Sequence, residues 1–193
     1  MKNQNNRKAH EKKTAEASEI IDGHFKAQEM IARGDYLDAR NLLEAIFDGE
    51  NADIANQLGF IYQQKEFPAR NIDLAIKYYG ISAKTGNLYG MHGLIASLRE
   101  KGEIETGLQW MEKASSAGSP KCSFTLYHHH KVSNPKIAEN YLFRAIQQGS
   151  VPAKQKMAIL KLSGRYGFGK IFEGLCECVS NIPDILKYAK DNA

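Results

Sequence analysis

The feature that most constrains the fold of this chain is a glycine that returns at a regular interval. Gly86, Gly118 and Gly149 are separated by 32 and 31 residues. Each glycine closes a segment in which a small residue is followed, three positions later, by an aromatic residue. These pairs are Ala75 and Tyr78, Gly107 and Trp110, and Ala138 and Tyr141. A period of this length is typical of solenoids built from stacked units.

The residue types of this repeat are those that two packed helices need. Residues three apart are neighbours on a helix, so the small residue lets a second helix approach while the aromatic ring fills the space beside it. Glycine ends a helix at low steric cost because it adopts the left-handed conformation. A second amphipathic stretch follows each glycine, at residues 89–98, 122–127 and 153–162. Each unit is therefore predicted to be a helical hairpin.

Two further units are expected upstream. Residues 34–49 read as a turn and a second helix, whose partner would run from about Glu16 to Ala32, and residues 55–62 begin the next unit. No segment alternates apolar and polar residues over the length of a strand. We expect an all-α, α/α solenoid of about four to five helix pairs at 16–163, after a flexible polar tail at 1–15 and before C-terminal capping helices at 164–193.

Composition narrows the class of protein. The net charge is +4, and the basic residues are interspersed with acidic ones, whereas a nucleic-acid binder clusters its basic residues on one face. Only the N-terminal tail is locally basic, and weak attachment to an anionic surface is the alternative to a solvated tail there. No apolar run approaches the length of about 18 residues needed to span a bilayer, and residues 1–20 do not form a signal peptide.

The cysteines indicate the compartment. The chain has three cysteines, at Cys122, Cys176 and Cys178. Because their number is odd and their spacing is irregular, they form no disulfide framework. Free, buried or half-buried thiols suit a reducing environment. Together with the polar N-terminus, they predict a soluble cytoplasmic protein.

One stretch of the sequence carries a family resemblance. Residues 58–62 (LGFIY), 73–79 (DLAIKYY) and 83–86 (AKTG) resemble one unit of the Sel-one-like repeat, a relative of the tetratricopeptide repeat. The resemblance covers about residues 30–160. It implies a right-handed superhelix whose concave face is lined by the first helix of each pair, and an adaptor or scaffold role. Some bacterial members are cysteine-rich secreted proteins described as acting on β-lactams. This chain lacks their paired cysteines, so we do not transfer that activity.

Residues 164–171 (GRYGFGKI) match a phosphate-binding loop except at the last position, where Ile171 replaces the hydroxyl residue that holds magnesium. Such a loop follows a buried strand, whereas a helical pattern ends here at Leu162. A turn before a C-terminal helix is the favoured interpretation. A hydrolase or nucleotide-binding enzyme is the alternative.

Three consecutive histidines, His128, His129 and His130, raise the question of a metal site. Consecutive residues on a helix point about 100° apart, so three in a row do not converge on one ion. We therefore expect no metal and no cofactor, and the histidines are interpreted as the end of a helix.

Aromatic residues at matching places in successive units form the candidate partner site. It consists of Tyr62, Tyr89, His92, Phe124 and Tyr127. Equivalent positions of a solenoid stack into a continuous stripe, and tyrosine is a frequent anchor of binding surfaces. Packing between helices is the alternative interpretation of the same rings.

The C-terminal stretch from Phe168 to Tyr188 is amphipathic, with Ile171, Leu175 and Val179 at four-residue steps. It is expected to cap the solenoid, and docking to a partner or a membrane surface is the alternative. No nucleophile–base motif is recognisable. The sequence thus predicts a non-enzymatic module, in a bacterium or phage, that binds a peptide or helix of another protein and no nucleic acid. The alternative is a membrane-peripheral regulator.

Overall fold

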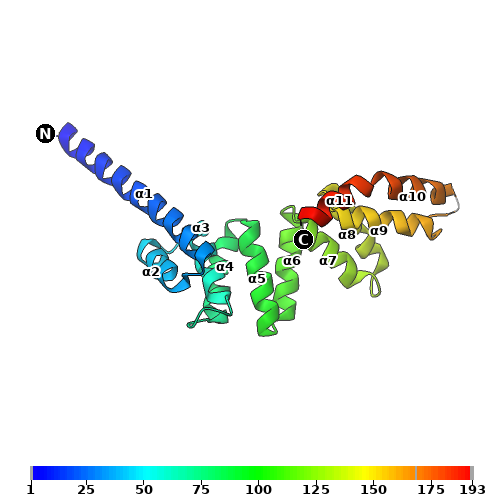
Figure 1. Ribbon diagram of the computed structural model, residues 1–193, viewed down its shortest axis with the longest axis horizontal. Helices are drawn as coiled ribbons and strands as arrows, with labels where there is room; N and C mark the ends of the chain where they lie inside the picture. The colour runs from blue at the N-terminus through cyan, green and yellow to red at the C-terminus, as the bar shows by residue number, and fades with distance from the viewer. Residues whose placement is uncertain (1, 168, 192–193) are drawn as a thin grey trace. The chain divides into compact units, whose positions relative to one another are not determined.

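A computed structural model describes the backbone of residues 2–167 and 169–191, and the side chains of residues 18–167, 169–171 and 173–191. Within these residues the chain forms eleven helices and no strand, which confirms the predicted all-α class (Figure 1). The helices are α1 (Lys2–Arg33), α2 (Tyr36–Ile46), α3 (Ala52–Gln63), α4 (Ile72–Lys84), α5 (Leu88–Lys101), α6 (Ile104–Ser116), α7 (Pro120–His130), α8 (Pro135–Gln147), α9 (Val151–Leu162), α10 (Gly169–Ser180) and α11 (Ile182–Asp191).

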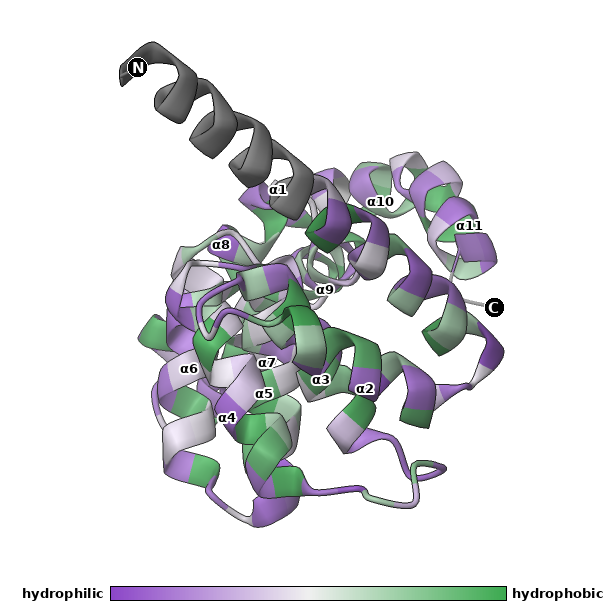
Figure 2. Cartoon of the chain, turned by 90° about the vertical axis from the view of Figure 1, so that its left-hand side faces the viewer, coloured by the Kyte–Doolittle hydropathy of each residue, from purple (hydrophilic) through white to green (hydrophobic). Residues whose placement is uncertain are grey.

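The chain divides into two compact units, residues 1–110 and 111–193, and the division falls inside α6. In unit 1, α1 packs on α2 and α3 packs on α4, and α5 packs on both α3 and α4. In unit 2, α7 packs on α8 and α9 packs on α10. Hydrophobic and hydrophilic residues are interspersed along α2, α3 and α5 (Figure 2). The helical hairpin predicted from the repeat is therefore the building block of both units.

The turns between helices follow from glycine and asparagine. The three repeat glycines, Gly86, Gly118 and Gly149, have φ angles of 88°, 101° and 89°, the left-handed conformation expected for them. Asn71 begins α4, and its side chain accepts hydrogen bonds from the N–H groups of Asp73 and Leu74. Asn51 and Asn87 cap α3 and α5 in the same way. Such caps satisfy N–H groups that have no partner within the helix.

Two neighbouring aromatic rings of α4 pack against other helices of unit 1. Tyr78, the ring to which the repeat pattern pointed, stacks on Tyr62 of α3 with ring centroids 5.7 Å apart. Tyr79 is only 4% exposed and lies against Gly59 of α3 and Gly93 of α5. A Cβ atom on either glycine would lie less than 3.0 Å from this ring. Glycine in these helices is therefore required by packing.

A buried hydrogen-bond network joins three helices of unit 2. The hydroxyls of Ser115 and Ser123 are 2.8 Å apart, and Ser123 donates to Gln148 Oε1 at 2.6 Å. Gln148 Nε2 in turn donates to the carbonyl oxygen of Ser115 at 2.7 Å. Both serines are fully buried and Gln148, the C-cap residue of α8, is half-buried, so the network links α6, α7 and the end of α8. The same unit contains an apolar cluster made of Tyr127, Ala138, Leu142, Ala145, Ala153 and Met157.

The first helix of the chain starts earlier than expected. α1 begins at Lys2, upstream of the expected start at Glu16, and the side chains of the predicted tail lie outside the described residues. At the other end α10 packs closely on α9, since a Cβ atom on Gly174 would lie 2.9 Å from the carbonyl oxygen of Ala158. Among the described residues, no helix combines the length and the apolar character that crossing a membrane requires.

Candidate functional site

An open groove of about 270 Å³ lies in unit 1, and we call it the unit 1 groove. Helix α1 contributes one side, α3 and α5 contribute the rest of the walls, and α4 contributes a ring to the floor. The lining residues are Gln28, Ile31, Asn56, Gln57, Phe60, Tyr79, Tyr89 and Gly93. The helices α1, α3 and α5 are the first helices of their pairs.

Aromatic side chains give the groove its apolar contact area. Tyr89, in the first turn of α5, is 78% exposed, and Phe60 of α3 is 38% exposed. Tyr89 is the one member of the predicted partner site that lines this groove. His92 follows Tyr89 on α5 by three residues and is half-buried. Exposed tyrosine beside a hollow surface is the arrangement found at the centre of many protein interfaces.

The floor of the groove is the ring of Tyr79. Its hydroxyl donates a hydrogen bond to Gln63 Oε1 at 3.1 Å. Burial raises the pKa of Tyr79 well above its ordinary value, so the ring stays neutral at physiological pH. Gly93 lies against this ring, and any side chain at that position would collide with it. The small residue thus serves both the packing of α4 and the depth of the groove.

Two carboxamides in the wall are incompletely satisfied. Gln57 is 8% exposed and its Oε1 atom is buried without a hydrogen-bond partner, and the same holds for the Oδ1 atom of Asn56. A buried polar atom without a partner costs about 1–3 kcal/mol. Since every other lining side chain is apolar, phenolic or amide, the walls of the unit 1 groove contain no charged group.

Tyr62, also expected at the partner site, lies in the core of unit 1. It is 5% exposed, packs edge-on against Phe67, and donates a hydrogen bond to Glu44 Oε1 at 2.6 Å. Burial raises the pKa of Tyr62, and the hydrogen bond to Glu44 adds to this effect. These contacts agree with the alternative interpretation of the aromatic residues, which is packing between helices.

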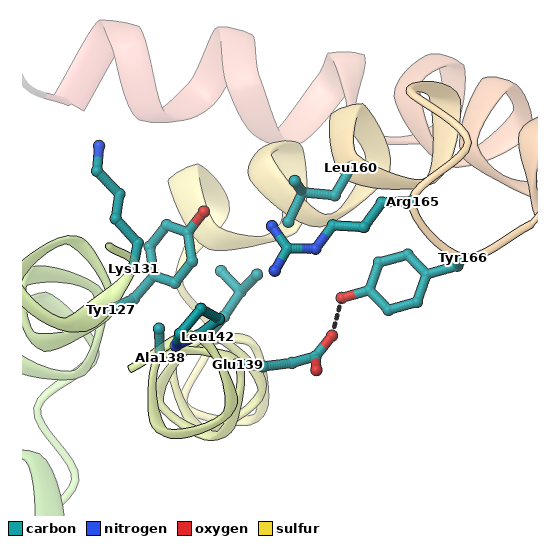
Figure 3. Close-up of a pocket in the computed structure, with 9 residues that line it drawn as sticks. Tyr127, Lys131, Ala138, Glu139, Leu142, Leu160, Arg165 and Tyr166 are labelled. Carbon is teal, nitrogen blue, oxygen red and sulfur yellow. Dashed lines mark hydrogen bonds between the residues drawn. The ribbon is translucent and has the colours of Figure 1, made fainter. Parts of the chain in front are cut away.

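The remaining two aromatics, Phe124 and Tyr127, lie in unit 2, where their rings are stacked with centroids 5.8 Å apart. Tyr127 is 5% exposed and borders a small cavity of about 10 Å³. Figure 3 shows Arg165 reaching over this cavity toward Tyr127, while the hydroxyl of Tyr166 donates a hydrogen bond to Glu139. Burial, together with that hydrogen bond, raises the pKa of Tyr166 to about 12. The cavity has room for about one water molecule.

The glycine-rich segment forms the turn between α9 and α10, as expected, with positive φ angles at Gly164 and Gly167. A helix precedes it where a phosphate-binding loop has a strand. Lys170 forms an ion pair with Glu173 on the same helix, which lowers the pKa of Glu173. Its ammonium group is therefore engaged within α10.

The three histidines end α7. His128 packs edge-on against Phe124 with centroids 4.7 Å apart, and burial, followed by the charges of Lys131 and Lys156, lowers its pKa. His130 stacks on Tyr141. Among the side chains that the structure describes, no three His, Cys, Asp or Glu residues gather in a way that would hold a metal ion.

Sequence reasoning did not identify Gln28, Asn56, Gln57 or Phe60 as site residues. Asn56, Gln57 and Phe60 lie within five residues of one another on α3, whereas Gln28 lies on α1 and joins them only through packing. The available signal was the pair Asn56-Gln57 in the middle of a largely buried helix, because polar amides on a buried helix require a reason.

Helical hairpins that repeat in this way, closed by left-handed glycines, define the class of α/α repeat proteins. Within that class the chain has the fold of Sel1-type repeats. The structure is similar to that of a Sel1 repeat protein from Oxalobacter formigenes, with a TM-score of 0.63 and 14% identity over 82% of this chain and 68% of that chain. No protein-family model and no curated protein matches the sequence.

Two other solved structures are similar. One is c5321, a protective antigen of uropathogenic Escherichia coli strains that displays an SLR fold; the TM-score is 0.58 at 17% identity, over 75% of this chain and 34% of that one. The other is MamA, with a TM-score of 0.55 and 14% identity over 85% of this chain and 96% of that one. At these identities the likeness shows the fold, and the resemblance seen in the sequence is confirmed at that level.

Proposed function

We propose that this protein is a non-enzymatic interaction module that holds a segment of a partner protein in the unit 1 groove. The observation that carries the proposal is the exposed Tyr89 at the edge of a hollow whose floor is Tyr79. A pre-formed apolar hollow with a few polar groups is the usual form of a binding site. The groove walls offer no carboxylate, imidazole, amine or thiol, which supports binding over catalysis.

The fold supports the same proposal. Sel1-type repeats present a row of first helices as one surface, and such surfaces suit the recognition of polypeptide segments. We place this role in the cytoplasm, in keeping with three free cysteines of which Cys122 is buried. Tyr62, Phe124 and Tyr127 are not needed by the proposal, and His92 would lie at the border of the contact.

Selection of a random displayed peptide library on the purified protein tests the proposal. We expect enrichment of one or more peptide families, whose affinity is then measured by fluorescence anisotropy. Tyr89→Ala should weaken binding by about tenfold or more, because it removes the central aromatic anchor. Phe143→Ala, which removes a 48% exposed ring in unit 2, is the matched control and should leave affinity unchanged. The proposal is wrong if no peptide is enriched, or if enriched peptides bind the Tyr89→Ala variant equally well.

Attachment to a membrane surface is a second candidate function, favoured by exposed apolar side chains near the C-terminus. Leu175 and Val179 of α10 are 52% and 61% exposed, and Leu186 of α11 is 65% exposed. Flotation with anionic liposomes tests it. Association that is lost in Val179→Glu and Leu186→Glu, with helix content unchanged by circular dichroism, would support this role. If the wild-type protein does not float with the liposomes, the membrane role is rejected.

A further inference from the structure

The carboxamides of Asn56 and Gln57 are the feature of the unit 1 groove that simple packing does not explain. Gln57 is more than nine-tenths buried, and its Oε1 atom has no hydrogen-bond partner. The neighbouring Asn56 leaves its Oδ1 atom equally unpaired. An apolar residue of similar size at position 57 would avoid this cost, since buried polar groups are favourable only when they are satisfied. The unpaired atoms therefore point to hydrogen bonds that form when the groove is occupied.

The chemistry of the walls restricts what the occupant can be. A charged occupant would lose its hydration without meeting an opposite charge, which is costly. Aromatic surface from Phe60 and Tyr89 is available for apolar contact. The occupant is thus uncharged where it enters the groove, with apolar side chains and with polar groups that can pair with an amide.

A side-chain carboxamide has the same complement of donors and acceptors as a peptide group. A polypeptide in extended conformation offers unpaired N–H and C=O groups along its backbone, whereas the interior of a helix has paired its own. Of the polypeptide conformations, an extended one matches the unpaired amides. The enclosed oxygens reach such a backbone by turning of the carboxamide about its terminal bond, a torsion with a broad and soft preference.

We propose that the unit 1 groove binds an extended, uncharged segment of a partner protein, and that Gln57 and Asn56 pair with its backbone. This inference rests on the proposed function and adds the conformation and chemistry of the segment. Tyr89 and Phe60 supply apolar contact to its side chains. Gln57 acts as a positioning residue that hydrogen-bonds to the main chain of the partner segment. Recognition at that point therefore depends on the backbone conformation of the segment more than on its sequence.

A comparison of stability and affinity in Gln57→Leu tests the inference. The probe is a peptide that is selected on the wild-type protein and that binds the Tyr89→Ala variant more weakly. Gln57→Leu should bind this peptide about tenfold more weakly, because the backbone loses its pairing partner. The same variant should be as stable as the wild type or more stable in urea unfolding, because an unpaired buried oxygen has been removed. Ser97→Ala removes another unpaired buried oxygen outside the lining of the groove, and it should leave affinity unchanged.

Chemical variants of the peptide give the second arm. N-methylation of the backbone nitrogen that pairs with Gln57 should weaken binding to the wild type by about tenfold and binding to Gln57→Leu by less than about twofold. Substitution of an internal residue by α-aminoisobutyric acid, which favours a helix, should also weaken binding. Stronger binding after that substitution would show a helical occupant and overturn the inference. Equal losses on N-methylation in both proteins would also overturn it.

The outcomes separate the inference from the proposed function. A Tyr89-dependent peptide whose affinity is unaffected by Gln57→Leu would retain the interaction module and reject the role of the carboxamides. The absence of any Tyr89-dependent peptide would reject both.

Discussion

A Cβ atom at Gly93 would lie 2.2 Å from Cε1 of Tyr79, so no side chain fits between α5 and the ring that α4 inserts beneath it. The hydroxyl of the same ring is held by Gln63 of α3. One residue of α4 therefore contacts two of the three helices that form the groove walls, and the depth of the groove depends on it.

This contact predicts that Gly93→Ala destabilises the protein by about 1–3 kcal/mol, the usual cost of overpacking a core. Gly80→Ala is the matched control, because Gly80 lies within α4 with no atom within 4 Å of a new Cβ. That substitution should stabilise the helix by about 0.5–1 kcal/mol. Urea unfolding measures both. In a Tyr79→Leu background the penalty of Gly93→Ala should shrink, and an unchanged penalty would place the collision elsewhere.

The cap of α4 predicts a second stability change. Asn71→Ala removes the acceptor for the N–H groups of Asp73 and Leu74, so it should cost about 1 kcal/mol in thermal or urea unfolding. Asn71→Ser retains a capping oxygen and should recover most of the loss. Equal losses in the two variants would mean that the side-chain oxygen is not what stabilises this helix start.

The buried hydrogen-bond network of unit 2 predicts that removing a single oxygen atom costs more stability than removing the cap of α4. Ser123→Ala removes one oxygen and leaves Gln148 Oε1 and the hydroxyl of Ser115 short of a partner, so it should cost about 1–3 kcal/mol. Ser116→Ala, at an exposed position on the same α6 that carries Ser115, should lie within about 0.5 kcal/mol of the wild type. Calorimetry on the two variants measures the difference. Similar values for both would argue that the network contributes nothing.

Burial of Tyr79 predicts sensitivity to alkali. Its pKa is raised in the folded state, so the unfolded chain loses this proton first as the pH rises. The resulting stability is fully present below about pH 10, the ordinary value for tyrosine, and is lost progressively above it. Tyr79→Phe should be less stable at pH 7, where it lacks the bond to Gln63, but its melting temperature should fall less between pH 9 and 11. A steeper fall in the variant would contradict the assignment.

Much of the fold is readable from the sequence because it depends on local rules. The repeat glycines end helices through their own conformation, and the asparagine caps act within three residues of themselves. The choice between Tyr78 and Tyr79 as the inserted ring is not local. It depends on how α4 is rotated against α3 and α5, and both residues fit an amphipathic pattern.

The candidate site was predictable only in part for the same reason. Tyr89 was identified because its position matches the repeat. Tyr62 shares that regularity, yet Glu44 and Tyr78 enclose it, and those contacts arise from residues of other helices. Gln28, Gln57 and Tyr89 lie far apart along the chain, so their convergence on one groove follows from packing alone.

The uncharged walls of the unit 1 groove have a kinetic consequence. Without fixed charges to attract a ligand from a distance, encounter depends on diffusion and orientation, which gives association rate constants of about 10⁵–10⁷ M⁻¹ s⁻¹. Such rates vary little with ionic strength, because screening acts on charges. Differences in affinity among ligands would then arise from how long each one stays bound.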